Sequence, residues 1–179
     1  MLNPILLMLL LSATPIIELR GGIPYGMFGN GGAPIMAWWQ IFVLCVVANT
    51  LAGFLVFELM GPVVTTFRRW PWFERHIWPR FDKTQYKLKP FLDKYGKFGL
   101  IVFIGVPIPG TGAYTGAVGS YLLGLPRKAF YIANILGVAV AGILVILLCF
   151  AIDTGFIGKD SLFSRLFLKS EYVTPPMTE

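Results

Sequence analysis

Glu18 and Arg20 are the residues whose types and spacing are best suited to chemistry. They interrupt an apolar stretch, between Ile16-Ile17 and Gly21-Gly22-Ile23. An ionisable group inside a membrane segment costs several kcal/mol on insertion scales, so it usually faces a partner or a cavity. Two such groups so close together predict a mutual ion pair or a shared ligand. The alternative is that both lie at the membrane interface, at the end of a short first helix.

A second stretch, residues 109–116, carries no charge but offers hydrogen-bond donors. A helix that begins near Gly112 would direct its free N–H groups and the positive end of its dipole toward the turn, an arrangement that suits phosphate or carboxylate. The candidate binding residues of this stretch are Gly110, Thr111, Gly112, Tyr114 and Thr115. The alternative is a tight turn whose small residues only allow close helix packing.

The elements that hold these residues are membrane helices. Of the 179 residues, 56% are hydrophobic and only 13% are charged, against roughly 25% charged residues in soluble domains. Residues 21–57, 98–126 and 129–152 carry no charge at all, and about 20 apolar residues span the hydrocarbon core. The composition predicts an all-α integral membrane protein with one compact domain.

An internal repeat is indicated by a shift of 85 positions. The shift aligns Pro24 with Pro109, and it aligns Ala-Asn-x-Leu around Asn49 with the same pattern around Asn134. Each half then reads as a re-entrant helical hairpin followed by a transmembrane helix, which together make an inverted repeat. We expect each asparagine to hydrogen-bond the broken backbone of a hairpin. The charges of Glu18 and Arg20 are not repeated, as expected if they serve a substrate.

The boundaries follow from this pattern. The chain divides into a first repeat at 1–60 (hairpin about 4–32, transmembrane helix about 41–60), a basic linker at 61–97, a second repeat at 98–152 (hairpin 98–126, transmembrane helix 127–152) and an amphipathic C-terminal segment at 153–179. Gly61-Pro62 is expected to end the first transmembrane helix. The predicted hairpin turns contain Gly21, Gly22, Pro24, Pro107 and Pro109.

The topology follows from the basic linker. Its nine basic and three acidic residues account for the whole net charge of +6, and basic loops are cytoplasmic. Arg127 and Lys128 are expected on the same side, so the segment 98–126 must return to the face where it enters. About 13 residues each way reach roughly 20 Å, close to the midplane. The alternative is that each broken segment is one kinked spanning helix. Aromatic residues and prolines interrupt the linker, so we expect interfacial helices on anionic lipid and no nucleic-acid partner.

Two motifs carry a family resemblance. Glu-Leu-Arg-Gly-Gly-Ile-Pro at 18–24, together with Lys-Tyr-Gly-Lys-Phe-Gly-Leu and Val-Pro-Ile-Pro-Gly-Thr-Gly-Ala-Tyr-Thr-Gly within 94–116, resembles the small multidrug export protein family over most of residues 15–150. That family is similar, distantly, to the DedA superfamily of membrane proteins with two re-entrant hairpins. The matching motif positions are Glu18, Arg20, Pro24, Pro107, Pro109, Gly110 and Thr111.

The resemblance implies a function class. DedA proteins are linked with moving polyprenyl phosphate lipids, such as undecaprenyl phosphate, across the cytoplasmic membrane, so the implied location is the inner membrane of a prokaryote, with several crossings. The sequence departs from DedA proteins in one respect, because its second hairpin has no acidic residue and no arginine. This departure weighs against a symmetric mechanism with two carboxylates.

Three functions stay open at this stage. The first is a transporter of an anionic amphiphile, with phosphate bound by Arg20 and the Pro-Gly-Thr-Gly turn, while Glu18 exchanges a proton or holds Arg20 in the empty site. The second is a proton-coupled exporter of small cationic drugs that uses Glu18, and the third is a membrane scaffold without transport. We expect no enzyme activity, metal or cofactor, and protons or a cation are candidate coupling ions. The expected partners are membrane lipids and the substrate, and a homodimer is compatible with the small size.

Overall fold

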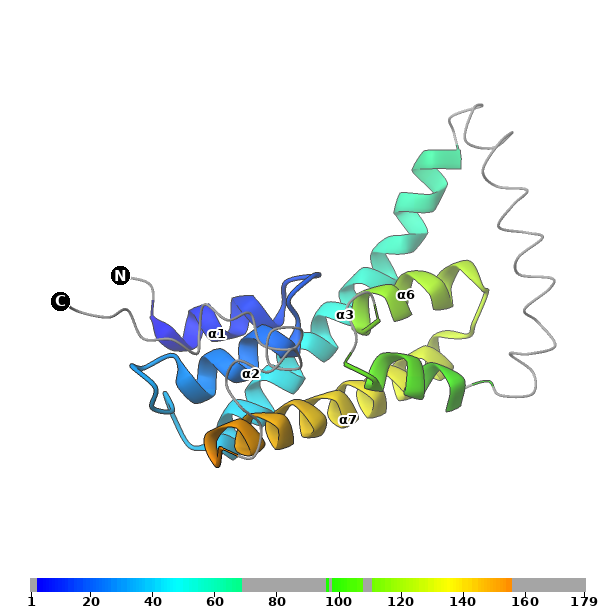
Figure 1. The fold of residues 1–179 in the computed structure, drawn as a ribbon. Helices are drawn as coiled ribbons and strands as arrows, with labels where there is room; N and C mark the ends of the chain where they lie inside the picture. The colour runs from blue at the N-terminus through cyan, green and yellow to red at the C-terminus, as the bar shows by residue number, and fades with distance from the viewer. Residues whose placement is uncertain (1–2, 69–95, 97, 108–110, 156–179) are drawn as a thin grey trace.

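The computed structural model describes residues 3–68, 96, 98–107 and 111–155. Within these residues, every element of regular structure is a helix (Figure 1). The labelled helices are α1 (Pro4–Ser12), α2 (Leu19–Phe28), α3 (Trp38–Arg68), α6 (Ala113–Leu122) and α7 (Arg127–Asp153). Residues 98–105 are also helical and precede α6 in the chain. The prediction of an all-α protein is confirmed for this part of the chain.

The two long helices, α3 and α7, run antiparallel through the molecule. Trp38 at the start of α3 meets Phe150 near the end of α7, with ring centroids 6.1 Å apart. Toward the other end, the ring of Phe57 stacks on that of Phe130 with centroids 4.5 Å apart. Among the described residues, these are the two helices long and apolar enough to cross a membrane. The predicted second transmembrane helix, 127–152, coincides with α7 to within one residue.

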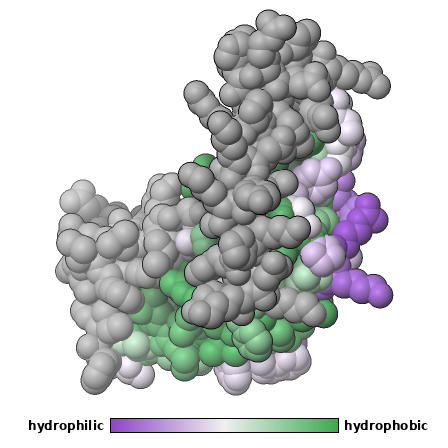
Figure 2. Space-filling view, turned by 90° about the vertical axis from the view of Figure 1, so that its right-hand side faces the viewer, coloured by the Kyte–Doolittle hydropathy of each residue, from purple (hydrophilic) through white to green (hydrophobic). Residues whose placement is uncertain are grey.

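Apolar side chains on both long helices face outward. The exposed ones on α3 recur at every fourth position and are Val43, Val47, Leu51, Leu55 and Leu59. Those on α7 are Ile132, Ile135, Leu136, Val140, Ile143, Leu144 and Leu147. Fewer than half of the residues in each apolar segment are buried, and Figure 2 shows broad hydrophobic surface on the face that it presents. Such surface is suited to lipid, which solvates aliphatic side chains as well as a protein core does.

The first pair of short helices packs closely because glycines line the contact. A Cβ on Gly22 would lie 1.8 Å from the hydroxyl oxygen of Ser12 in α1, and one on Gly26 would lie 2.9 Å from the sulfur of Met8 and 2.6 Å from Ile41 in α3. These contacts pair the end of α1 with the start of α2, so the two helices are antiparallel. With nine and ten residues, each helix is about 15 Å long.

The turn between α1 and α2 lies at residues 13–18, earlier than the sequence suggested. Gly21, Gly22 and Pro24 were predicted to form it, and this prediction is wrong because all three lie inside α2. Pro24 is the sixth residue of α2. Its ring therefore removes only the donor for the carbonyl of Arg20, in the first turn. Helices in membranes tolerate one missing donor of this kind.

The second pair of short helices consists of residues 98–105 and α6. Ile104 is 2% exposed and lies between α6 and α7, where a Cβ on Gly116 or Gly137 would approach its side chain to 2.7 Å. The predicted helix start near Gly112 is confirmed, since α6 begins at Ala113. Pro107 precedes the break between these helices, as predicted, while Pro109 and Gly110 lie outside the described residues.

Each pair of short helices contacts the long helix of the other half of the chain. α2 packs against α7 as well as α3, and α6 packs against α3 as well as α7 (Figure 1). In Figure 1, α1 and α2 lie on one flank of the long helices, while α6 lies beside α3 farther along. This crossed packing brings the ends of α2 and α6 together in the interior.

The helix α3 is longer than predicted. Gly61-Pro62 was expected to end it, and this prediction is wrong because α3 continues through both residues to Arg68. Pro62 removes the backbone donor for the carbonyl of Glu58, and the hydroxyls of Thr65 and Thr66 donate to the carbonyl of Pro62 itself at 3.0 and 2.8 Å. Most of the basic linker (69–95 and 97) and the C-terminal segment from 156 lie outside the described residues.

Candidate functional site

Glu18 ends the turn that precedes α2, and its backbone is strained. Among the described residues it is the one non-glycine residue with positive φ, at 51°. Its amide donates to the carbonyl of Thr14 at 2.9 Å, and its own carbonyl accepts from the amides of Gly21 and Gly22. This conformation costs a residue with a side chain about 1–3 kcal/mol and is found chiefly where function requires it. The side chain is directed inward, and the residue is 7% exposed.

Gly112 supplies the surface on which the Glu18 carboxylate rests. It precedes α6 with φ 144° and ψ −167°, a region that only glycine occupies readily. A Cβ at this position would lie 2.0 Å from Oε2 of Glu18. Any other residue would therefore suffer both backbone strain and overlap with the carboxylate.

The Glu18 carboxylate lies at the N-terminus of α6. Its Oε1 accepts a hydrogen bond from the backbone amide of Tyr114, with the two heavy atoms 3.5 Å apart. The first amides of a helix have no partner within the helix, and they carry the positive end of its dipole. The anion site that the sequence predicted at this helix end therefore holds the protein's own carboxylate.

Two further hydrogen bonds join residues 13–20 to residues 111–114, and a third crosses the second helix break. Arg20 donates from Nη2 to the carbonyl oxygen of Thr111 at 2.9 Å. Tyr114 donates from its hydroxyl to the carbonyl of Ala13, in the turn after α1. The hydroxyl of Thr111 donates to the carbonyl of Val106 at 2.7 Å, across the second helix break. We call Glu18, Arg20, Thr111, Gly112 and Tyr114 the break site, because they join the two breaks in the short helices.

A small cavity of about 10 Å³ lies beside the break site, which is about enough for one water molecule. Its lining combines the charged and polar groups of the break site with apolar side chains of α7, among them Ala141, and with Asn49 of α3. Asn49 is 2% exposed, and its Oδ1 has no hydrogen-bond partner within the described residues. A buried carbonyl oxygen is normally paired with a hydrogen-bond donor.

The cavity lies about halfway along the stretch in which α3 and α7 pack on each other, between the contact of Trp38 with Phe150 and the ion pair of Glu58 with Arg127. In α3, Asn49 is eleven residues from Trp38 and nine from Glu58, or about 16 and 14 Å along the helix axis, and α3 continues beyond Glu58 to Arg68. In α7, Ala141 is fourteen residues from Arg127 and twelve from Asp153, or about 21 and 18 Å. The charged groups of the break site are therefore far from both ends of the helix pair.

The remaining predicted residues lie apart from the cavity. Thr115 is exposed, and its hydroxyl donates to the carbonyl of Gly112 in its own helix at 3.4 Å. Asn134 donates to the carbonyl of Thr50 in α3 at 3.1 Å. The partner of Asn134 is therefore α3 and not the backbone of a helix break, so the expectation is wrong for Asn134, while for Asn49 it stays a prediction. The side chain of Asn134 instead links the two long helices, at a place where Gly53 lets them approach closely.

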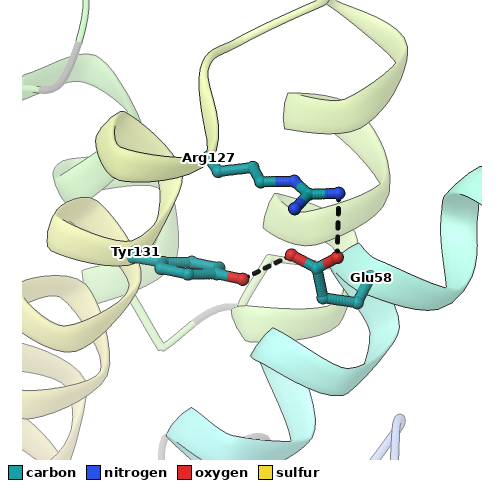
Figure 3. A network of polar contacts seen from close by, with 3 residues as sticks. All are labelled: Glu58, Arg127 and Tyr131. Carbon is teal, nitrogen blue, oxygen red and sulfur yellow. Dashed lines mark hydrogen bonds and ion pairs between the residues drawn. The ribbon is translucent and has the colours of Figure 1, made fainter.

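Sequence reasoning missed a second polar cluster, at the ends of the long helices. Glu58 of α3 accepts a hydrogen bond from the hydroxyl of Tyr131 at 2.5 Å and forms an ion pair with Arg127 at 3.2 Å (Figure 3). We call these three residues the end network. Its signal in the sequence was the opposite charge of Glu58 and Arg127 at the ends of two helices expected to pack antiparallel. The described residues contain no group of three side chains suited to hold a metal ion.

Comparison with known proteins adds one match. The family model described as "Putative small multi-drug export protein" matches residues 18–144. The matched region begins at Glu18 and contains the whole break site, the end network and most of both long helices. No curated protein and no solved structure matches the chain.

Proposed function

The chain belongs to the small multi-drug export protein family, and on this premise we propose that it transports an anionic amphiphile across the membrane. The membership and the two apolar helices indicate a membrane exporter. The proposed cargo is a polyprenyl phosphate carrier lipid such as undecaprenyl phosphate, and the proposed location is the cytoplasmic membrane of a prokaryote. The break site is the proposed place where the headgroup binds.

One observation carries this proposal: a guanidinium and a helix N-terminus meet about halfway along the stretch in which two helices of membrane length pack on each other. The hydrocarbon core is about 30 Å thick, and the cavity lies about 14 to 21 Å from the two ends of that stretch. If α3 and α7 span the membrane, the break site lies close to its midplane. Transport sites built from interrupted helices occupy this depth, and buried charges are otherwise too costly to retain there.

The architecture supports a duplicated scaffold around this site. α1 and α2 are each about 15 Å long, half of the hydrocarbon core, and they are antiparallel, as a re-entrant hairpin requires. α6 and residues 98–105 make a similar short pair. The antiparallel direction of α3 and α7 fits two halves of opposite orientation. We therefore propose two re-entrant hairpins in an inverted repeat, in a protein that crosses the membrane more than once.

The chemistry of the site favours a phosphate headgroup. A guanidinium is planar and always charged, and it binds phosphate oxygens with parallel hydrogen bonds. Arg20 supplies this group, and the N-terminus of α6 supplies backbone amides beside it. The rest of the cavity is largely apolar and too small for a whole amphiphile. A lipid whose tail stays in the hydrocarbon while its headgroup crosses fits these limits.

A reconstitution experiment tests the proposal. Liposomes that hold the full chain and a short polyprenyl phosphate are exposed to an impermeant phosphatase, and the fraction of protected phosphate is followed over time. Arg20→Ala should lower the transfer rate at least about tenfold, as expected from the loss of one charge-assisted hydrogen bond. Arg127→Ala removes the same side chain at the end network and should leave the rate unchanged. Wild-type transfer by Arg20→Ala would refute the proposal.

A second function, export of small cationic drugs, is favoured by the name of the matched family and by one structural feature. Glu18 is an acidic group buried beside an apolar cavity, as a site that exchanges a proton for a lipophilic cation requires. The amide of Tyr114 and the nearby guanidinium of Arg20 already compensate its charge, however, and this weakens attraction to a cation. Cation-driven release of protons from the same liposomes, without transfer of phosphate lipid, would favour this second function.

A further inference from the structure

We propose that Glu18 is a tethered competitor for the transported anion, so that each anion that binds takes up one proton on the Glu18 carboxyl. In this scheme the neutral carboxyl turns from the N-terminus of α6 to the oxygen of Asn49. The inference rests on the proposed function and adds what that function lacks, the group that links anion binding to protons and the place that holds the proton.

The first step is that Glu18 occupies the place an anion would take. Its Oε1 accepts from the amide of Tyr114 at 3.5 Å, and its Oε2 lies 2.0 Å from the position that a Cβ of Gly112 would take. The cavity beside it has room for about one water molecule and cannot hold a phosphate group in addition. A phosphate oxygen can reach these amides only after the carboxylate has left them.

The second step concerns charge. A carboxylate and a phosphate that share one buried site repel each other, and this repulsion favours the neutral form of the carboxyl. Among the residues that the structure describes, Arg20 is the one cationic side chain in the lining of the cavity. It can compensate one negative group, so the incoming anion takes the guanidinium and Glu18 becomes neutral. The proton comes from solution, and no other bond is made or broken.

The third step is an independent observation at Asn49. This side chain is 2% exposed and lines the same cavity from α3, yet its Oδ1 has no partner within the described residues. An ionised carboxylate is only an acceptor and gives this oxygen nothing, whereas a protonated carboxyl is a donor. A protonated Glu18 that turns toward Asn49 therefore supplies directly the donor that this oxygen lacks.

The other groups that face Glu18 do not compete for this proton. The lining from α7 and from residues 98–107 is apolar where it is described, and α3 contributes Asn49. Within the described part of the chain, the titratable groups in contact with the site are Arg20 of α2 and Tyr114 of α6. Arginine and tyrosine side chains ordinarily lose their protons above pH 12 and near pH 10, and the Tyr114 hydroxyl is a donor to Ala13.

Calorimetry on the purified full chain tests this inference. The probe is dibutyl phosphate, a diester that stays a monoanion near neutral pH, so that any proton taken up belongs to the protein. Binding heats measured at pH 8.5 in buffers of different ionisation enthalpy give the number of protons per anion. We expect about one proton for the wild type, and a dissociation constant that rises about tenfold for each pH unit.

Variants assign the proton to its residue. Glu18→Gln should bind the probe with no proton uptake and with an affinity independent of pH. Glu58→Gln changes the carboxylate of the end network and should keep one proton per anion. Asn49→Leu should weaken binding at pH 8.5 about tenfold, because the protonated carboxyl loses its acceptor.

The outcomes separate this inference from the proposed function. If the wild-type protein binds the probe without proton uptake, the inference is wrong while the proposed function stands. If the wild-type protein binds no anion at any pH, both are wrong. Proton uptake that persists in Glu18→Gln would also overturn the inference, since the proton would belong to another group.

Discussion

Glu18 and Glu58 are two carboxylates of the first half of the chain, and each one is held by groups from the second half. Glu18 is 7% exposed and lies about halfway along the stretch in which α3 and α7 pack, whereas the side chain of Glu58 is 40% exposed at one end of that stretch. An exposed ion pair contributes about 0–1 kcal/mol and is screened by salt. A buried carboxylate is costly unless several groups compensate it. The carboxylate contact therefore contributes little to stability at the end network, whereas at the break site the buried carboxylate depends on its partners.

The partners of the two carboxylates differ as well. Glu58 is held by the long side chains of Arg127 and Tyr131, which can follow a shift of either helix. Glu18 is held by a backbone amide of α6 and rests on a glycine, neither of which can move without the helix. The break site therefore fixes the relative position of the two breaks, while the end network adapts to it.

The largest effect is expected from Gly112→Ala. The new methyl would overlap Oε2 of Glu18, 2.0 Å away, on a backbone with φ 144°. We expect a loss of at least about 2 kcal/mol in the free energy of unfolding, and loss of transport. Unfolding in mixed SDS and detergent micelles, followed by far-UV circular dichroism, measures the first quantity.

The same helix provides the control for this substitution. Gly119 also lies in α6, and a Cβ there would meet no atom within 4 Å. Gly119→Ala should leave transport unchanged and stabilise the protein by up to about 1 kcal/mol, through better helix propensity. Equal behaviour of the two alanine variants would show that the Glu18 carboxylate does not rest on Gly112.

A smaller effect is expected from removing one hydroxyl at each region. Tyr114→Phe removes the donor to Ala13 that ties α6 to the first turn, and we expect a loss of about 1 kcal/mol. Tyr131→Phe removes the donor to Glu58 at the exposed end, and we expect about 0.3 kcal/mol or less. The same unfolding assay measures both. A larger loss for Tyr131→Phe than for Tyr114→Phe would reverse the ranking of the two regions.

The long helices could be read from the sequence because their signal is local. An uncharged apolar run from 129 to 152 is long enough to span a membrane, and α7 occupies Arg127–Asp153. The meeting of the two breaks was also predicted, because two hairpins expected to enter from opposite faces would converge near the midplane. Glu18 and Arg20 were found because charge is rare in such segments.

The exact break in the first half could not be read in the same way. Gly21, Gly22 and Pro24 suggested a turn, but all three lie inside α2, where Gly22 packs against Ser12 of α1. The true break is at Glu18, whose residue type gives no sign of a positive φ. The role of Asn134 could not be read for the same reason, since its partner depends on how α3 and α7 pack.

The smallest effect is expected from Glu58→Gln. The ion pair with Arg127, whose side chain is 73% exposed, should contribute about 0.5 kcal/mol or less at low ionic strength. A double-mutant cycle with Arg127→Gln isolates this coupling from other effects of each change. Because the pair is in contact with solvent, its coupling should fall further in 0.5 M salt. A coupling above about 2 kcal/mol that salt does not weaken would place the end network among buried sites, and the contrast between the two carboxylates would be lost.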